Sequence, residues 1–178
     1  KLLDPTMGGE GVKPYQPPGM WKELMHPGSN TKNYVADKGS RLYRRSLYVY
    51  WKRTSPHPMM TLFDAPSREA SCVRRSRTNT PLQSLALFNE PQRVEAARKL
   101  AERLLKAQKD DDARLDLLFT LVASRKPSKT ERLACQKLLQ SQRARFADKD
   151  EEAEALCKVG NAPRDPDLDP KEIAAWTQ

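Results

Sequence analysis

The sequence lacks the features that mark membrane, disulfide-rich and haem-binding proteins. No apolar run approaches the roughly 20 residues that a membrane-spanning helix needs, and charged residues make up 31% of the chain. The three cysteines form no CxxC pair and no CxxCH motif, which argues against a disulfide framework, a zinc site and covalently bound haem. We therefore expect no membrane span, no metal site and no cofactor in this chain.

Two kinds of N-terminal motif are also missing. The first residues, KLLDPTMGG, lack the basic and then apolar build of a signal peptide. The glycine-rich stretch GGEGVKP lacks the GK[ST] ending and the preceding apolar strand of a phosphate-binding loop, which argues against a nucleotide site. The abrupt beginning and end predict a segment of a longer protein, so we do not expect to read the localisation from the termini.

What the chain has in excess is basic charge, concentrated in one segment. The formal net charge is +9, and residues 41–77 hold nine basic residues against Asp64 and Glu69. A surface of that sign favours an anionic partner such as an acidic polysaccharide, nucleic acid, anionic lipid or an acidic protein. The alternative is that these arginines pair internally with Asp and Glu from the helices. The nine are Arg41, Arg44, Arg45, Lys52, Arg53, Arg68, Arg74, Arg75 and Arg77.

The hydrophobic pattern predicts a mainly α protein. A chain of 178 residues is within the range of one domain, so we predict a single domain over 1–178. It divides into a loop-rich N-terminal part with a short helix (1–40), a basic, aromatic and loop segment (41–80) and a helical array (81–178). We expect short helices in an antiparallel array, a long ordered loop rich in proline and arginine, and at most a minor extended segment.

The N-terminal part is broken up by glycine and proline, which leaves one short helix. GMWKELM places Trp21, Leu24 and Met25 at helical spacing, so these three residues are expected to form one apolar face. In the polar loop that follows, Tyr34 and Val35 are expected to reach the core.

Two stretches of the basic segment are harder to assign. SLYVYWKR leaves a helix and an isolated extended segment open, because no second strong strand exists to pair with it. Residues 54–77 contain three prolines and little periodicity, which predicts a long ordered loop of the kind that often carries function. Its expected anchors are Met59, Met60, Leu62 and Phe63.

From Thr80 onward the sequence contains several groups of residues that are typical of helix N-termini. Thr80-Pro81-Leu82-Gln83 and Ser128-Lys129-Thr130-Glu131 are capping boxes, Asp110 to Asp112 suit a helix N-terminus, and Asn89 and Asp169 open two further helices. A helix over 151–158 is expected to end at Gly160 in the left-handed conformation. The helices should bury Leu82, Leu85, Ala86, Phe88, Val94, Ala97, Ala101, Leu104, Leu105, Leu115, Leu118, Phe119, Val122, Cys135, Leu138, Leu139, Ile173 and Trp176, and leave Arg93, Glu95, Lys99, Glu102 and Arg103 mostly outside.

Catalytic chemistry has one candidate cluster in the central loop. His57 and Asp64, with Ser67 or Ser71, supply the residue types of a nucleophile, a base and an orienting acid. Sequence spacing does not bring them together, and a histidine between two prolines is more typical of a turn. We therefore predict no catalytic residue in this chain.

The stronger hypothesis is binding. Arginines interleaved with aromatic residues can present guanidinium groups and ring faces to an anionic glycan or to an acidic partner domain. In a third interpretation the same arginines organise the fold, by satisfying helix C-termini and buried carboxylates. The candidate binding residues are Arg44, Arg45, Tyr48, Trp51, Arg53, Arg74, Arg75 and Arg77. Tyr50 and Lys52, which lie in the same stretch, could add to this surface.

Four strings carry a family resemblance. They are VKPYQPPGMW, LYRRSLYVYWKRTSPHPMMTLFDAPSRE, CVRRSRTNTPLQSLALFNEPQRVEAARKLAERLL and EIAAWTQ. Together they resemble domain of unknown function 1553, the planctomycete-type domain at the C-terminal end of large proteins. In this family a final apolar helix normally follows the last string.

The resemblance implies an exported, multidomain bacterial protein, and thus a periplasmic or extracellular place. Members often carry a separate cytochrome c domain, so haem is expected only there, and they occur in Planctomycetes and related bacteria that degrade complex polysaccharides. The family assigns no catalytic residues. We predict a non-catalytic interaction or scaffold module, with other domains of the same polypeptide and anionic or sulfated polysaccharide as partners and nucleic acid not expected. The alternative is a part of a carbohydrate-active or redox enzyme site completed by other domains.

Overall fold

The structure is a computed structural model that describes residues 3–23, 26, 28–29 and 32–178. Over these residues the regular structure is helical, and extended pairing is limited to isolated bridges. The prediction of a mainly α fold with at most a minor extended segment is therefore confirmed. Within the same described part of the chain, no helix is both long and apolar enough to cross a membrane.

The chain divides into two compact units, Leu2–Glu90 and Pro91–Gln178. The single domain expected over 1–178 stays a prediction. The described helices of the first unit are α1 (Met20–Glu23), the 3-10 helices η1 (Gly39–Tyr43) and η2 (Ser46–Tyr48), α2 (Pro58–Leu62) and α3 (Pro81–Asn89).

The N-terminal segment of the first unit runs beside the basic segment. Asp4 pairs with Arg44 and Val12 with Val49 as isolated parallel bridges, and both valines are buried. Residues 46–53 therefore begin as one turn of 3-10 helix and continue extended. Each of the two alternatives that the sequence left open is realised in part.

An aromatic cluster forms the core of this unit. Trp21 is 3% exposed, and its ring meets the edge of the Tyr34 ring at 4.8 Å between centroids. Val35 is 70% exposed, so its predicted contact with the core is wrong; the chain turns Tyr34 inward and its neighbour outward. Leu24 and Met25, the rest of the expected apolar face, lie outside the described residues.

The long loop expected over 54–77 contains one short helix, α2. Pro58 occupies its first position, where a missing N–H costs nothing, and His57 precedes it. Five residues are too few for a helical period to show in the sequence. The expected anchors Met59, Met60, Leu62 and Phe63 are half-buried, as predicted.

The capping box of α3 is confirmed, but the buried face of the helix is not the predicted one. Thr80 accepts from the Gln83 backbone N–H, and the Gln83 side chain accepts in return. The buried Gln83 amide also donates to the Leu62 carbonyl and to the Thr78 hydroxyl, both at 2.9 Å. This tie turns the apolar side of α3 to the surface, where Leu82, Leu85 and Phe88 are 60%, 58% and 75% exposed.

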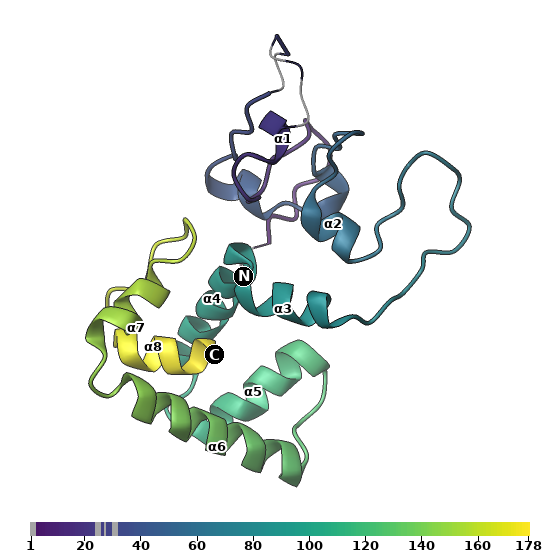
Figure 1. Cartoon of the computed structure of the whole chain (residues 1–178). Helices are drawn as coiled ribbons and strands as arrows, with labels where there is room; N and C mark the ends of the chain where they lie inside the picture. The colour runs from purple at the N-terminus through teal and green to yellow at the C-terminus, as the bar shows by residue number, and fades with distance from the viewer. Residues whose placement is uncertain (1–2, 24–25, 27, 30–31) are drawn as a thin grey trace. The chain divides into compact units, whose positions relative to one another are not determined.

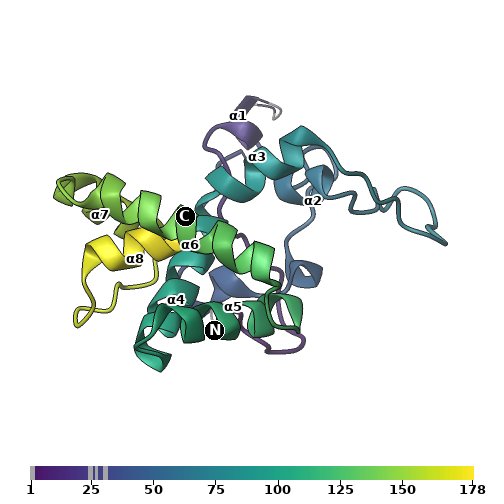
Figure 2. The ribbon, with the colours of Figure 1, turned by 90° about the horizontal axis from the view of Figure 1, so that it is seen from below.

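The second unit is a group of helices around its last one. Helix α8 packs against α4, α6 and α7, and the ribbons show it among them in both views (Figures 1 and 2). The unit consists of α4 (Pro91–Ala107), α5 (Asp111–Ala123), α6 (Lys129–Phe146), α7 (Asp150–Cys157) and α8 (Pro170–Thr177).

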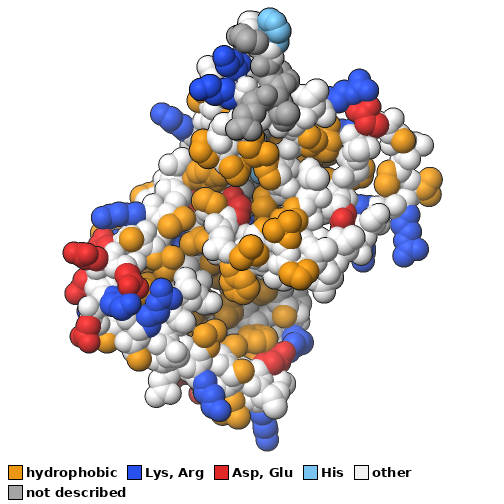
Figure 3. Space-filling view, in the orientation of Figure 1, with side chains coloured by type: hydrophobic (Ala, Val, Ile, Leu, Met, Phe, Trp, Pro, Cys, Tyr) orange, Lys and Arg blue, Asp and Glu red, His pale blue; other side chains and the backbone are white. Residues whose placement is uncertain are grey.

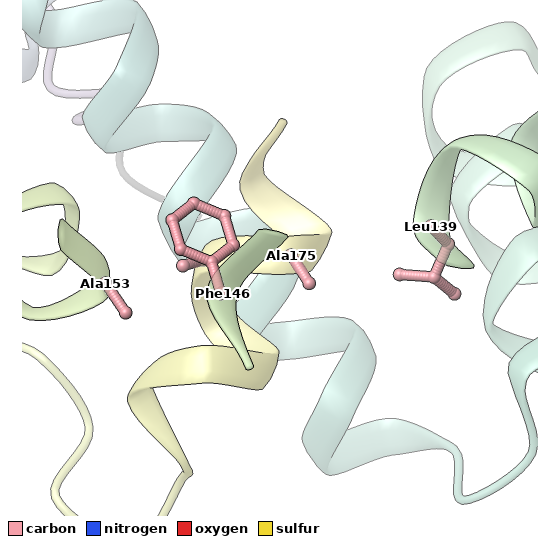
Figure 4. Packing of buried hydrophobic residues seen from close by; sticks show 5 residues of the cluster. Leu139, Phe146, Ala153 and Ala175 are labelled. Atoms are coloured by element: carbon pink, nitrogen blue, oxygen red, sulfur yellow. The ribbon is translucent and has the colours of Figure 1, made fainter. Parts of the chain in front are cut away.

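Small residues allow α8 to approach its neighbours closely. Ala174 and Ala175 are buried in one apolar cluster with Leu139, Phe146 and Ala153 (Figure 4). Leu156 and Trp176 pack on the edge of the cluster. Ile173 on the same helix is fully buried, so the apolar face predicted for this helix is confirmed.

Three predicted helix starts of this unit are confirmed by their hydrogen bonds. The start of α4 is not, because Asn89, which was expected to open it, is the last residue of α3 and its side-chain amide donates to the Leu85 carbonyl at 2.8 Å. The Asp110 carboxylate accepts from the Ala113 N–H at 3.0 Å, and Ser128 and Glu131 complete a reciprocal capping box. Asp169 accepts from an N–H of the first turn of α8. These contacts are local, which is why the sequence was sufficient to predict them.

Helix α4 buries charge that was expected outside. Glu95 and Glu102 are 0% and 4% exposed, so their predicted exposure is wrong. Glu95 accepts from the Ala162 N–H, while Arg98 donates to Glu102 at 2.7 Å and to the Ala162 carbonyl at 2.6 Å. The helix therefore holds the turn before α8 with charged groups rather than with apolar contacts.

A second charged tie joins three helices. The Arg143 guanidinium of α6 binds both oxygens of Asp111 on α5 and both oxygens of Glu172 on α8. The hydrogen bonds from Arg143 lower the pKa of Asp111.

Two predictions of buried apolar residues on α5 and α6 are wrong, because Val122 and Leu138 are 70% and 50% exposed. The buried faces of these two helices are narrower than the hydrophobic pattern indicated.

Gly160 is the position of this unit that we expect to tolerate substitution least. Its φ is +87°, and a Cβ there would lie 2.6 Å from both carboxylate oxygens of Glu95. We predict that Gly160→Ala lowers the free energy of unfolding by about 2–4 kcal/mol, through left-handed strain and overpacking together. Urea unfolding measures the loss. The matched control is Gly19→Ala, since Gly19 has a φ of +86° with nothing within 4 Å. Equal losses at the two positions would contradict the clash with Glu95.

Candidate functional site

Arg44 and Tyr48 hold the glycine-rich N-terminal turn. The Arg44 guanidinium stacks 4.0 Å above the Tyr48 ring and donates to the carbonyls of Thr6 at 2.8 Å and Gly8 at 2.6 Å. Tyr48 accepts from the Gly8 N–H at 3.0 Å. These two candidate residues are therefore occupied within the first unit. The neighbouring Arg45 is exposed, and among the described residues its guanidinium is given a single partner, the Met7 thioether.

A second group of contacts closes the loop between α2 and α3. Asp64, in the left-handed region at φ 55°, accepts from the Thr78 N–H at 2.7 Å and from its hydroxyl. Arg75 donates to the carbonyls of Asp64, at 2.7 Å, and Phe63. Arg75 thus satisfies the C-terminal end of α2, as the organising interpretation expects of some arginines.

The start of the same loop is held by a third set of contacts. Arg53 makes a bidentate pair with Glu69 at 2.7 and 2.6 Å. Arg68 lies 4.8 Å above the ring of Trp51. Trp51 and Arg53 therefore both contact the loop, although Arg53 remains exposed, and the ring face of Trp51 is covered by a guanidinium.

Arg74 and Arg77 differ from the other candidates. Both are exposed, and the structure gives neither a hydrogen bond nor an ion pair with another described residue. They belong to the segment between α2 and α3, which extends away from both helices in both ribbon views (Figures 1 and 2). Lys and Arg side chains project from this edge of the surface (Figure 3).

Lys52 is buried, so its predicted place on the binding surface is wrong. It is 8% exposed, and its ammonium lies 4.0 Å above the Trp21 ring. Burial lowers its pKa, and the nearby charge of Lys13 lowers it further. The Lys13 ammonium is 5.6 Å from the Tyr50 ring. The sequence carried no sign of this lysine and tryptophan cluster, because the segments that meet in it are about 30 residues apart.

The residues of the catalytic hypothesis are not brought together. His57 is buried, and its Nε2 donates to the Tyr15 carbonyl at 2.7 Å. Asp64 is engaged by Thr78, and the Ser67 hydroxyl accepts from a nearby N–H of its own loop. Ser71 is exposed on that loop. Each residue has a structural role or a solvent-facing position, so the geometry gives no nucleophile with a base beside it.

Metal and cysteine chemistry find little support in the described residues. Among these residues no group of three or more His, Cys, Asp or Glu side chains could hold a metal ion. Cys72, Cys135 and Cys157 are free thiols. Burial raises the pKa of the Cys157 thiol, which keeps it protonated at neutral pH.

Comparison with known proteins identifies one family. The model of the family described as "PSD1: Protein of unknown function (DUF1553)" matches residues 1–139. No curated protein and no solved structure matches the chain. The matched range includes the whole basic segment and ends within α6.

The hydrogen bonds between Asp64 and Thr78 can be tested by substitutions of Asp64. The hydrogen bonds from Thr78 lower the pKa of Asp64, so the stabilisation is present at neutral pH and is lost as the pH falls below about 4. We predict that Asp64→Ala lowers the melting temperature at pH 7, while Asp64→Asn, which tolerates the left-handed conformation and keeps an acceptor, lowers it less. Thermal unfolding followed by circular dichroism measures both. The idea fails if the two variants melt alike.

His57 should make the protein sensitive to mild acid. Burial lowers its pKa below the ordinary 6.5, so the unfolded chain binds this proton more readily and stability falls as the pH drops from about 7 to 5. We predict a smaller drop in melting temperature over that range for His57→Gln, whose amide can donate to the Tyr15 carbonyl without titrating. Parallel melting curves of the two proteins across the range would contradict this assignment.

Proposed function

The chain belongs to the DUF1553 family of proteins of unknown function, and we propose that it is a non-catalytic binding module for an anionic polysaccharide. The single observation that carries the proposal is the contrast within one loop. Its ends are tied to α2 and to residues 51–53, whereas Arg74 and Arg77 have no described partner. Arginines that organise a fold make contacts within it, so these two are the ones left for a ligand.

The guanidinium groups of Arg74 and Arg77 favour an anionic ligand. The planar guanidinium fork binds carboxylate, sulfate and phosphate through paired hydrogen bonds. The loop from Asp64 to Asn79 contains four arginines against two acidic residues, Asp64 and Glu69, and both carboxylates are already bound to the protein. A ligand would therefore meet guanidinium groups without a competing carboxylate among these residues.

Contacts within the protein also restrict the conformation of the loop before a ligand binds. Arg75 lies between the two proposed binding residues and is held to the end of α2. Its contacts limit the backbone conformations on either side, so less conformational entropy is lost when a ligand binds. Arg45 and the exposed Tyr50 are further candidate residues of the first unit that a long polymer could reach.

The choice of a polysaccharide rests on the family resemblance. The resemblance implies an exported protein, placed in the periplasm or outside the cell, of bacteria that degrade complex polysaccharides. No nucleic-acid-binding motif occurs in the sequence. An acidic domain of the same polypeptide is the second partner of suitable charge, and the enzyme site completed by other domains stays a prediction.

The test uses charge-neutralising variants with a matched control. We predict that Arg74→Gln with Arg77→Gln weakens binding to heparin at least about tenfold at about 50 mM salt, because each lost charged hydrogen bond is worth about 1.5–3 kcal/mol. Arg103→Gln with Lys137→Gln removes the same charge from exposed positions on α4 and α6 and should change the affinity less than about twofold. Isothermal titration calorimetry measures both.

A panel of glycans decides between recognition and general charge attraction. Sulfated, carboxylated and neutral polysaccharides are compared at about 50 and 200 mM salt, the range over which charge-driven binding weakens. Saturable binding that differs between glycans of equal charge density supports a recognition site. Binding to none of them, or equal weakening by the two double variants, would refute the proposal.

A further inference from the structure

The loop that carries Arg74 and Arg77 also has the geometry of a protease substrate. Every residue from Pro66 to Asn79 is exposed, and none belongs to a helix or a bridge. We propose that the peptide bond between Arg74 and Arg75 is a cleavage site for endoproteases that cut after arginine, and that the two fragments stay bound after the cut. This inference does not depend on the proposed binding function.

The backbone of the loop is open for pairing with a protease. From Ala70 to Arg77 no backbone N–H or carbonyl forms a hydrogen bond with another described residue. Extended peptides are recognised through main-chain hydrogen bonds of the kind that join β-strands. These residues can therefore pair with an active site as an extended strand without breaking backbone hydrogen bonds of their own.

Within residues 70–77, the side chains select one bond among those that follow the three arginines. An arginine-specific protease draws the side chain before the cut bond into an acidic pocket. Arg75 is held by the carbonyls of Phe63 and Asp64 and does not reach such a pocket. Arg77 is followed directly by Thr78, whose N–H is bound to Asp64. Arg74 has an unpaired side chain with four open residues before it, so the cut is expected there.

The contacts of the loop lie on both sides of this bond. On the first fragment, Glu69 is paired with Arg53. On the second, Arg75 and Thr78 remain bound to the end of α2, and the Gln83 amide remains bound to the Leu62 carbonyl. The two fragments therefore keep their shared interface after the covalent link is broken.

The reaction is an ordinary hydrolysis. Water adds across the C–N bond, leaving a carboxylate on Arg74 and an amine on Arg75, which is protonated at neutral pH. The net charge of the protein is unchanged, but a carboxylate now lies beside the Arg74 guanidinium. Cleavage also separates the backbone of Arg74 from that of Arg77, so the pair is no longer held by one loop.

The test is limited proteolysis of the whole chain. With a small amount of trypsin we expect the first products, identified by mass spectrometry, to be 1–74 and 75–178. On size-exclusion chromatography without denaturant they should elute together at the position of the intact chain, and in urea they should separate. A protease that cuts only after lysine is the control, because residues 53–98 contain no lysine.

Two variants make the assignment specific. Arg74→Gln should slow the first cut at least about tenfold, whereas Arg77→Gln should leave its rate within about twofold, as expected when only one side chain enters the pocket. A first cut at any other bond would overturn the assignment to Arg74. Fragments that separate without denaturant would overturn the claim that the contacts of α2 and α3 hold them together.

Discussion

The Asp64 carboxylate is the contact on which the described geometry of the first unit most depends. Asp64 ends α2 in the left-handed conformation, and Thr78 precedes α3. Their hydrogen bonds bring together two positions 14 residues apart, and the Gln83 amide joins the same group. Without these hydrogen bonds the two ends of the loop would not be held together. Few other contacts would then join α2 to α3, because the apolar side of α3 faces outward.

The second unit uses the same physical device. Glu95 and Arg98 of α4 bind the backbone of Ala162, so the turn before α8 is fixed by buried charge. A buried charge is costly unless it is paired and hydrogen-bonded. Here Arg98 is paired with Glu102, and Glu95 accepts from the Ala162 N–H. The result is a defined path into α8, whose alanines then reach the apolar cluster.

The helices could be predicted from the sequence largely where the signal is local. Capping boxes, helix-start aspartates and the left-handed Gly160 act within one turn, so Ser128 and Asp169 were read correctly. Ala101 and Leu104 of α4 are buried as predicted, but the buried polar residues of α3 and α4 could not be predicted. Gln83 and Glu95 are polar residues whose burial depends on backbone groups about 20 and 67 residues away, and hydrophobic periodicity contains no information about such partners. The same reason explains Lys52, which was expected on the surface.

For the candidate site, composition predicted a basic segment but not the roles within it. The sequence offers six arginine candidates, and only contacts distinguish Arg75, bound at the end of a helix, from Arg74 beside it. Neighbouring residues of the same type thus have opposite roles, one structural and one exposed. Binding and internal pairing, which the sequence offered as alternatives, are both consistent with the structure at different arginines.

The anchored base of this loop also bears on how the family can diversify. The loop is held by Glu69, by Arg75 and by the pair Asp64 and Thr78, so added residues between Glu69 and Arg75 leave these contacts in place and mainly alter the entropy of closing the loop. Doubling the length of a flexible loop costs about 0.6 kcal/mol, little compared with the stability of a typical domain. We therefore expect insertions between Glu69 and Arg75 to be tolerated, so that the reach of the loop can change while the helices on either side remain as they are.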